Sequence, residues 1–414
     1  MPVRKKQIFE SQMLSDHERK NLSILELIRR NGSITRADIS KTTELNIVTI
    51  SNYINGYINE GLVIEGGIEA SSGGRKPTLV KLNEDYGYTI GIDLGHMGTG
   101  GASTLGIVTD LTGRVLARVE HKRPKDNIDR LINKSLDLID ELINKESSYK
   151  DKIKGVGIGI GGVIDGTLGT IRDSSKNGIR TNYLSIIDLI DKKFGISAFL
   201  GNDASFAAFG EKMYTIPIDV ENIIYMYSDV GTGIIIKGNV YCGASGSAGE
   251  VRINVPQNVE YLKFSKSFSF LLPLGLDLGL VGQATRLIGN EGVKSSILTL
   301  SNNKIEDITV DNIIQAAKSG DTLGIELLED AAVNLGVRIA YLVNLFNPDI
   351  VIIGGGVEAA GSLFLDPLRK TVRKWAFEEA ANTVKIIPAQ LGKDGVALGG
   401  AGVVIRDIFI SANA

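Results

Sequence analysis

The segment 325–356 reads IELLEDAAVNLGVRIAYLVNLFNPDIVIIGGG and contains one complete helix–strand unit. Apolar residues at three- and four-residue steps predict an amphipathic helix over 325–346. These residues are Leu328, Ala332, Leu335, Ile339, Leu342 and Phe346. Pro348 ends the helix, and the apolar run 350–353 before three glycines is typical of a buried strand. The segment therefore predicts a strand covered by a helix, which is the repeating unit of an α/β fold.

The same alternation extends through residues 83–414. The sequence predicts strands at 89–95, 154–163, 198–200 and 384–387, a hairpin over 104–118, and helices at 126–145, 184–194, 203–212 and from about 395 onward. At ~150 residues per domain, 414 residues correspond to two or three compact units. We expect a first α/β lobe over 83–202, completed by a C-terminal helix at 396–414, and a second lobe over 203–395. Trp375 lies in a helical stretch, where we expect it to pack.

The composition is that of a globular protein, with 43% hydrophobic and 22% charged residues. Cys242 is the only cysteine, so an intrachain disulfide is excluded, and the three histidines show no metal-ligand spacing. We therefore expect no metal and no cofactor. The N-terminus resembles no signal peptide, and no apolar run reaches the ~18 residues that a membrane span needs. These features predict a cytoplasmic protein with no membrane partner.

Residues 1–82 carry 12 basic and 9 acidic side chains, a net charge of +3 within a chain of net charge −3. A helical stripe covers 17–30, Thr35 and Asn46 are placed to cap two further helices, and strands follow at 62–64 and 77–82. Two helices joined by a short turn and followed by a hairpin are typical of a winged helix-turn-helix. Residues 1–82 are therefore predicted to be a DNA-binding domain.

The third helix of this domain is the expected recognition helix. Ile47, Ile50, Ile54 and Ile58 recur on one face, which we expect to be buried. The opposite face carries short polar side chains, and a glycine-rich wing adds two basic residues. The predicted DNA contacts are Thr49, Ser51, Asn52, Arg75 and Lys76. A helical protein-docking module with a solvated polar face remains the alternative.

Several motifs together resemble the ROK family (repressors, open reading frames, kinases), in particular its transcriptional regulators such as xylose and N-acetylglucosamine repressors. The motifs are residues 73–77 (GGRKP), 91–95 (GIDLG), 157–162 (GIGIGG), 201–205 (GNDAS), 243–250 (GASGSAGE) and 354–356 (GGG). The resemblance spans nearly the whole chain. It implies an actin-like, ribonuclease-H-like fold of two lobes with sugar bound between them, and a homodimer or tetramer.

The resemblance also assigns candidate sugar-binding residues. Asp203 matches the general base of ROK sugar kinases, and Asn202 and Glu250 match positions that hydrogen-bond the sugar. Carboxylates and amides suit this role because they can hold several hydroxyl groups at once. The alternatives are a helix N-cap for Asp203 and a surface charge for Glu250.

The departures from the kinase pattern indicate that phosphate binding is lost. Residues 96–100 read HMGTG where the family has a tight glycine loop, and Tyr227 and Asp229 occupy the second phosphate loop. Ile253 replaces the zinc-binding histidine, and residues 256–270 contain no cysteine. Phosphoryl transfer depends on holding the phosphates, so we expect no kinase activity and no catalytic residue.

The sequence thus predicts a sugar-responsive transcriptional repressor that binds a double-stranded DNA operator and acts in carbohydrate metabolism. An active ATP-dependent sugar kinase with a DNA-binding head is the main alternative, in which Asp203 would be catalytic. A regulator that answers to a protein partner and a structural docking protein are further alternatives.

Overall fold

The computed structural model describes residues 14–68, 77–95, 103–122, 128–146, 148–165, 170–172, 180–182, 184–227, 231–244, 246–250 and 279–412. The chain forms two compact units, residues 1–214 with 394–414, and residues 215–393. The first unit therefore contains α6 (Asp203–Tyr214), whereas the sequence analysis began the second lobe at residue 203. The helix α6 belongs to the first unit because it is buried there along nearly its whole length.

The head of the first unit is a three-helix bundle with a small antiparallel sheet of order β1-β3-β2. Its elements are α1 (Asp16–Asn31), β1 (Ile34–Thr35), α2 (Arg36–Thr43), α3 (Ile47–Asn59), β2 (Val63–Ile68) and β3 (Thr78–Leu82). Both predicted caps are confirmed: the Thr35 hydroxyl accepts the Asp38 N–H at 3.1 Å, and the Asn46 side chain accepts the Thr49 N–H at 2.8 Å. These elements form a winged helix-turn-helix.

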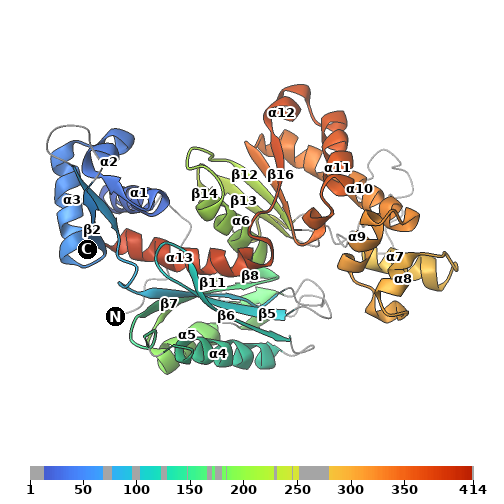
Figure 1. The fold of residues 1–414 in the computed structure, drawn as a ribbon, viewed down its shortest axis with the longest axis horizontal. Coiled ribbons are helices and arrows are strands. Elements are labelled where there is room, and N and C mark those ends of the chain that lie inside the picture. The colour runs from blue at the N-terminus through green and yellow to red at the C-terminus, as the bar shows by residue number, and fades with distance from the viewer. Residues whose placement is uncertain are drawn as a thin grey trace. The chain divides into compact units, whose positions relative to one another are not determined.

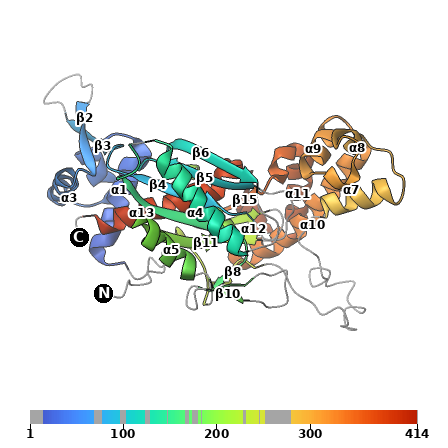
Figure 2. The same ribbon diagram turned by 90° about the horizontal axis from the view of Figure 1, so that it is seen from below.

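The remainder of the first unit is a mixed sheet of order β11-β7-β4-β5-β6. Its strands are β4 (Tyr88–Asp93), β5 (Ser103–Thr109), β6 (Val115–Lys122), β7 (Ile153–Ile160) and β11 (Ser197–Asn202). The helices α4 (Ile128–Asn144) and α5 (Leu184–Phe194) cover one face, and α13 (Gly395–Ser411) lies on the other (Figures 1 and 2). A second, small sheet contains β8 (Val163–Asp165), β9 (Thr170–Arg172) and β10 (Arg180–Asn182).

Glycines allow α13 to lie directly against this sheet. A Cβ atom on Gly91 would lie 1.8 Å from the carbonyl oxygen of Ala397, and one on Gly157 would lie 2.1 Å from that of Gly400. The same holds between helices, where a Cβ on Gly399 would lie 1.8 Å from the carbonyl oxygen of Phe206 in α6. No real Cβ approaches backbone so closely, so glycine is required at these positions.

The second unit has its own mixed sheet, of order β14-β13-β12-β15-β16. Its strands are β12 (Ile223–Tyr227), β13 (Gly231–Ile236), β14 (Asn239–Val240), β15 (Ile350–Gly354) and β16 (Lys385–Pro388). Its α-helices are α7 (Leu280–Gly289), α8 (Ser296–Leu300), α9 (Val310–Lys318), α10 (Thr322–Phe346), α11 (Ser362–Trp375) and α12 (Glu378–Thr383). The predicted helix and strand of segment 325–356 are confirmed as α10 and β15, whose apolar faces share one core.

Two expectations about individual side chains are wrong. Ile47 is 48% exposed, because Ile50, Ile54 and Tyr57 already complete the buried face of α3. Trp375 is 59% exposed at the end of α11. Among the described residues, no helix combines the length and apolar character needed to cross a membrane.

Candidate DNA-binding head, sugar-binding residues and the junction between them

The surface of α3 carries the predicted DNA contacts that the structure describes. Asn52 is exposed, whereas Thr49 and Ser51 are half-buried. The exposed Asn55 accepts a hydrogen bond of 3.1 Å from the guanidinium of Arg36, the first residue of α2. The other two predicted contacts, at positions 75 and 76, lie outside the described residues. The short polar side chains of α3 can make hydrogen bonds to base edges in a major groove.

Asn202 and Asp203 lie where β11 passes into α6. The Asn202 side chain accepts the Ser205 N–H and donates to the carbonyl of Gly162, both at 3.1 Å. Asn202 therefore caps α6, a role that the sequence analysis considered for Asp203. Asp203 is only 4% exposed, and its carboxylate accepts the Ala204 N–H at 2.7 Å. A carboxylate in the first turn of a helix is also favoured by the helix dipole.

A third polar group lies at the same edge of the sheet. Asp93 ends β4, and its carboxylate accepts the Gly95 N–H at 2.7 Å. In the sheet, Asp93 pairs with Gly159 and Asn202 pairs with Ile160, so the two residues flank the end of β7. Ligands of α/β sheets bind beyond the carboxyl ends of the strands. The sequence analysis quoted Asp93 in a motif but did not select it, although an acidic residue ending an apolar strand is a usable signal.

Glu250 belongs to the second unit. Its N–H donates to the Ser247 carbonyl at 3.3 Å, in a loop held to β13 by the Thr232 N–H, which donates to the Gly249 carbonyl at 3.1 Å. Tyr227 ends β12, and its ring stacks on Tyr225 with 6.2 Å between the ring centroids.

The remaining departures from the kinase pattern fall in three parts of the chain. His96 and Met97, Asp229, Ile253 and the segment 256–270 all lie outside the described residues. In the part of the chain that the structure describes, no three His, Cys, Asp or Glu side chains gather in a way that could hold a metal ion.

The head is attached to the far end of α6 by two arginines of α1. Arg29 donates to the Met213 carbonyl at 2.6 Å, and Arg30 donates to the Lys212 carbonyl at 2.7 Å. Glu26 accepts from both guanidiniums. These carbonyls end a helix, where the dipole favours positive charge. Burial disfavours the charge on Arg29, but the hydrogen bonds and negative charge of Glu26 outweigh it, so the pKa of Arg29 lies above its ordinary value.

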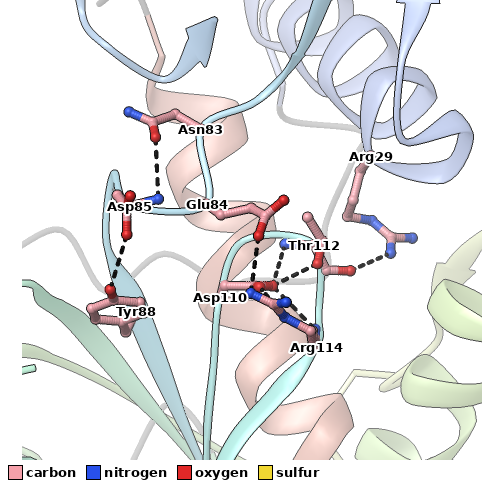
Figure 3. Close-up of polar contacts among 8 residues, drawn as sticks. All are labelled: Arg29, Asn83, Glu84, Asp85, Tyr88, Asp110, Thr112 and Arg114. Carbon is pink, nitrogen blue, oxygen red and sulfur yellow. Dashed lines mark hydrogen bonds and ion pairs between the residues drawn. The ribbon is translucent and has the colours of Figure 1, made fainter. Parts of the chain in front are cut away.

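Arg29 also contacts the turn between β5 and β6 (Figure 3), donating to the Thr112 carbonyl at 3.2 Å. The fully buried Asp110 shapes this turn, since it accepts from the N–H groups of Thr112 and Arg114 and from the Thr112 hydroxyl. Arg114 in turn donates to Asp110 at 3.1 Å and to Glu84 at 2.9 Å. The turn therefore presents its carbonyl to the head in a fixed position.

Tyr214, the last residue of α6, fills the space beneath these contacts. The Arg29 guanidinium lies 5.1 Å from the centre of its ring, within range of a cation–π interaction. A Cβ on Gly113 would lie 2.1 Å from the same ring, so the turn packs directly on the tyrosine. Burial raises the pKa of Tyr214 even though Arg29 acts to lower it. We call Glu26, Arg29 and Arg30, with the carbonyls of Thr112, Lys212 and Met213, the α1–α6 junction.

A second buried link joins α3 to α13. The Asn21 side chain of α1 is fully buried and donates to the carbonyls of Ile410 and Ala412. Its oxygen accepts a hydrogen bond of 2.7 Å from the hydroxyl of Tyr57 in α3. Burial raises the pKa of the Tyr57 phenol, which keeps it a donor. Both links connect residues far apart in the sequence, and the sequence analysis identified neither.

The two α/β units and the head define a class: a two-lobed, actin-like protein with an N-terminal winged helix-turn-helix. The model of the ROK family matches residues 89–260 and 284–407. The chain belongs to the ROK family.

Its relatives include the xylose repressor of Caldicellulosiruptor bescii, 31% identical over 398 residues that cover 94% of this chain and 96% of the repressor. The crystal structure of a ROK family transcriptional regulator, a homologue of the E. coli MLC protein, superposes with a TM-score of 0.73 at 23% identity. It covers 95% of this chain and 97% of that one.

A ROK family glucokinase from Streptomyces griseus, solved in complex with glucose and AMPPNP, matches with a TM-score of 0.63 at 25% identity. The match covers 99% of the kinase but 77% of this chain. The full-length likeness is therefore to transcriptional regulators of the family.

Proposed function

We propose that this protein is a sugar-responsive transcriptional repressor that binds operator DNA through α3 and the wing. The full-length likeness to a xylose repressor supports this function. One observation carries the mechanism: α6 begins at Asp203, a candidate sugar ligand, and ends at the carbonyls that Arg29 and Arg30 hold. A single buried helix thus joins the candidate sugar-binding residues to the head.

The proposed signal is a small movement of α6. Sugar hydroxyls bound by Asn202 and Asp203 pull on the first turn of a helix about 18 Å long, given its 12 residues. Because α6 is a continuous buried helix, a shift of its first turn along the helix axis also moves its last turn and the α1–α6 junction. Coupling of ~1–3 kcal/mol between two sites changes affinity roughly 5–150-fold, which is enough to release a repressor. Glu250 stays a prediction as a further sugar ligand.

The test is DNA binding itself. A duplex is selected from a random pool with the wild-type protein, and its binding is followed by fluorescence anisotropy while pentoses, hexoses and their phosphates are added one at a time. At least one sugar should weaken binding within the range given above, and affinity should fall as salt rises. Failure to bind any duplex would refute the proposal.

An active kinase is the rival function, and the solved glucokinase shows that the scaffold can hold a sugar and a nucleotide analogue. We propose instead that phosphoryl transfer is lost, because the bulky pair His96 and Met97 stands in the first phosphate loop and Tyr227 and Asp229 stand in the second. A coupled assay with ATP, magnesium and the same sugars separates the two functions. Robust turnover that disappears in Asp203→Asn would establish the kinase.

Asp203→Asn is expected to weaken the sugar response. Asparagine keeps the shape of the side chain but loses the charge that strengthens hydrogen bonds from sugar hydroxyls. Hydrogen bonds to charged groups contribute about 1.5–3 kcal/mol and neutral ones about 0.5–1.5 kcal/mol, so a loss of about 1–1.5 kcal/mol should raise the sugar concentration for half release roughly 5- to 13-fold. Basal DNA affinity should stay within a few-fold. Asp191→Asn, an exposed carboxylate of α5 in the same unit, is the matched control and should change neither quantity.

The second unit offers a surface for the dimer that two operator half-sites require. Tyr341 and Leu345 of α10 are exposed, and the neighbouring Phe377 is 72% exposed, with its N–H donating to Asn344. Trp375 lies two residues before Phe377 and is also exposed. Exposed apolar patches of this kind mark association sites. We propose that a second copy of the chain covers this patch.

Phe377→Glu should therefore weaken self-association. If Phe377 is an anchor residue of the interface, its loss costs about 2 kcal/mol or more, so the dimer dissociation constant measured by sedimentation should rise roughly 30-fold or more. Ile218→Glu, at another exposed apolar position of the same unit, serves as the control. Equal dimerisation of both variants and wild type would place the interface elsewhere.

A further inference from the structure

The first turn of the recognition helix exposes two large apolar side chains. Ile47 and Val48 follow the capping Asn46 directly and are 48% and 66% exposed. The core of the head lies beneath the following turns of α3, where Ile50 and Ile54 are fully buried. Two adjacent exposed apolar side chains at the start of a helix form a small apolar surface that a partner can contact.

The composition of α3 limits what that contact can be. The helix, residues 47–59, contains no Lys, Arg, His, Asp or Glu. It therefore lacks the side chains that pair bidentately with guanine and those that accept from cytosine. What it presents is apolar methyl groups, hydroxyls and the amides of Asn52 and Asn55. Apolar groups contact the C5-methyl of thymine, and asparagine pairs with N6 and N7 of adenine. Both preferences point to A·T pairs.

The position of each residue along α3 indicates which base it can contact. Residues at the N-terminal end of a recognition helix reach base edges in the major groove. Ile47 and Val48 occupy that end, and Asn52 lies one turn further along. The Asn55 oxygen already accepts from Arg36, so Asn52 is better placed for a bidentate contact.

Resting on the proposed DNA-binding function, we propose that Ile47 and Val48 are specificity-determining residues that contact thymine methyl groups in each half-site. Asn52 pairs with an adenine close to those thymines. The half-site is accordingly recognised through A·T pairs in the major groove, independently of the basic wing.

Deoxyuridine tests this directly, because it differs from thymidine only by the missing C5-methyl. The duplex is the one selected from the random pool, and each thymine is replaced by deoxyuridine in turn. Loss of one buried methyl contact should weaken wild-type binding roughly fourfold, from the transfer energy of a single carbon group. At least one thymine in each half-site should behave in this way, and thymines outside the half-sites should not.

The variant Ile47→Ala/Val48→Ala closes the thermodynamic cycle. It should bind the thymine duplex more weakly than wild type, and deoxyuridine should then cause no further loss at the same positions. The substitutions lie at exposed helical positions where alanine is a good helix former, so the fold is expected to persist. Val115→Ala, a β-branched residue 40% exposed on β6, is the matched control and should keep the wild-type pattern.

The outcomes separate this inference from the function on which it rests. If wild type binds no duplex, both fail. If wild type binds a selected duplex and deoxyuridine changes nothing, or weakens wild type and the double variant equally, the thymine contacts are refuted while DNA binding stands. A double variant with unchanged DNA affinity but a lower sedimentation mass would assign Ile47 and Val48 to a protein interface, which also overturns the inference.

Discussion

Replacing Gly399 with alanine should destabilise the first unit by about 3 kcal/mol, the upper part of the usual range for overpacking a core. The new methyl group would lie 1.8 Å from the carbonyl oxygen of Phe206. That oxygen belongs to the backbone of α6 and cannot rotate away, so α6 and α13 must separate. Calorimetric unfolding of the full chain is the measurement, because the two units can give separate transitions.

The matched control is Gly282→Ala. Gly282 is a helical residue of α7 where an added Cβ meets nothing within 4 Å. Alanine is a better helix former than glycine, so this substitution should leave stability unchanged or raise it by up to about 1 kcal/mol. If Gly399→Ala behaved like its control, the close contact between α6 and α13 would be wrong.

Glu26→Ala is expected to have an effect of about 3–5 kcal/mol, the typical cost of removing one partner from a buried ion pair. The Arg29 side chain is only 5% exposed, and Glu26 forms two hydrogen bonds with it, of 2.7 and 2.8 Å. Without the carboxylate, Arg29 and Arg30 repel each other in a poorly hydrated site. Hydrogen exchange of amides in α1 should report the loosened head, and the effect of sugar on DNA affinity should shrink.

The same helix provides the control for this prediction. Asp16 forms an ion pair with Lys20, but both side chains lie at the surface. Exposed ion pairs contribute little to stability because water and salt screen them, so Asp16→Ala should change stability only slightly and leave the sugar response intact. Similar losses in both variants would show that the α1–α6 junction does not couple the head to α6.

The sequence predicted the elements that depend on local signals. Periodicity located α1, α4, α5 and α10, and the caps at Thr35 and Asn46 set the starts of α2 and α3. It missed β1, because two residues are too few for any pattern. It also misjudged Ile47, because a three- and four-residue repeat does not reveal where the underlying core ends. The first turn of α3 extends past that core.

For a similar reason, the sequence identified the candidate sugar-binding residues but not the α1–α6 junction. Asn202 and Asp203 lie next to each other in the sequence, so a short motif could identify them. The α1–α6 junction joins Arg29 to carbonyls 83 and 184 residues away. The acceptors are backbone carbonyls, which every type of residue has, so no sequence motif could identify them. Only the tertiary structure brings these groups together.

The late position of α13 in the sequence has a consequence for synthesis on the ribosome. The first unit is discontinuous, and residues 395–411 fill the space between its sheet and α6 while also receiving Asn21 from the head. The continuous second unit emerges earlier and can fold by itself, as domains generally do during translation. The buried link from Tyr57 through Asn21 to α13 therefore forms only after residues 395–411 have been made, whereas the contacts of Arg29 and Arg30 with the β5–β6 turn and α6 can form earlier.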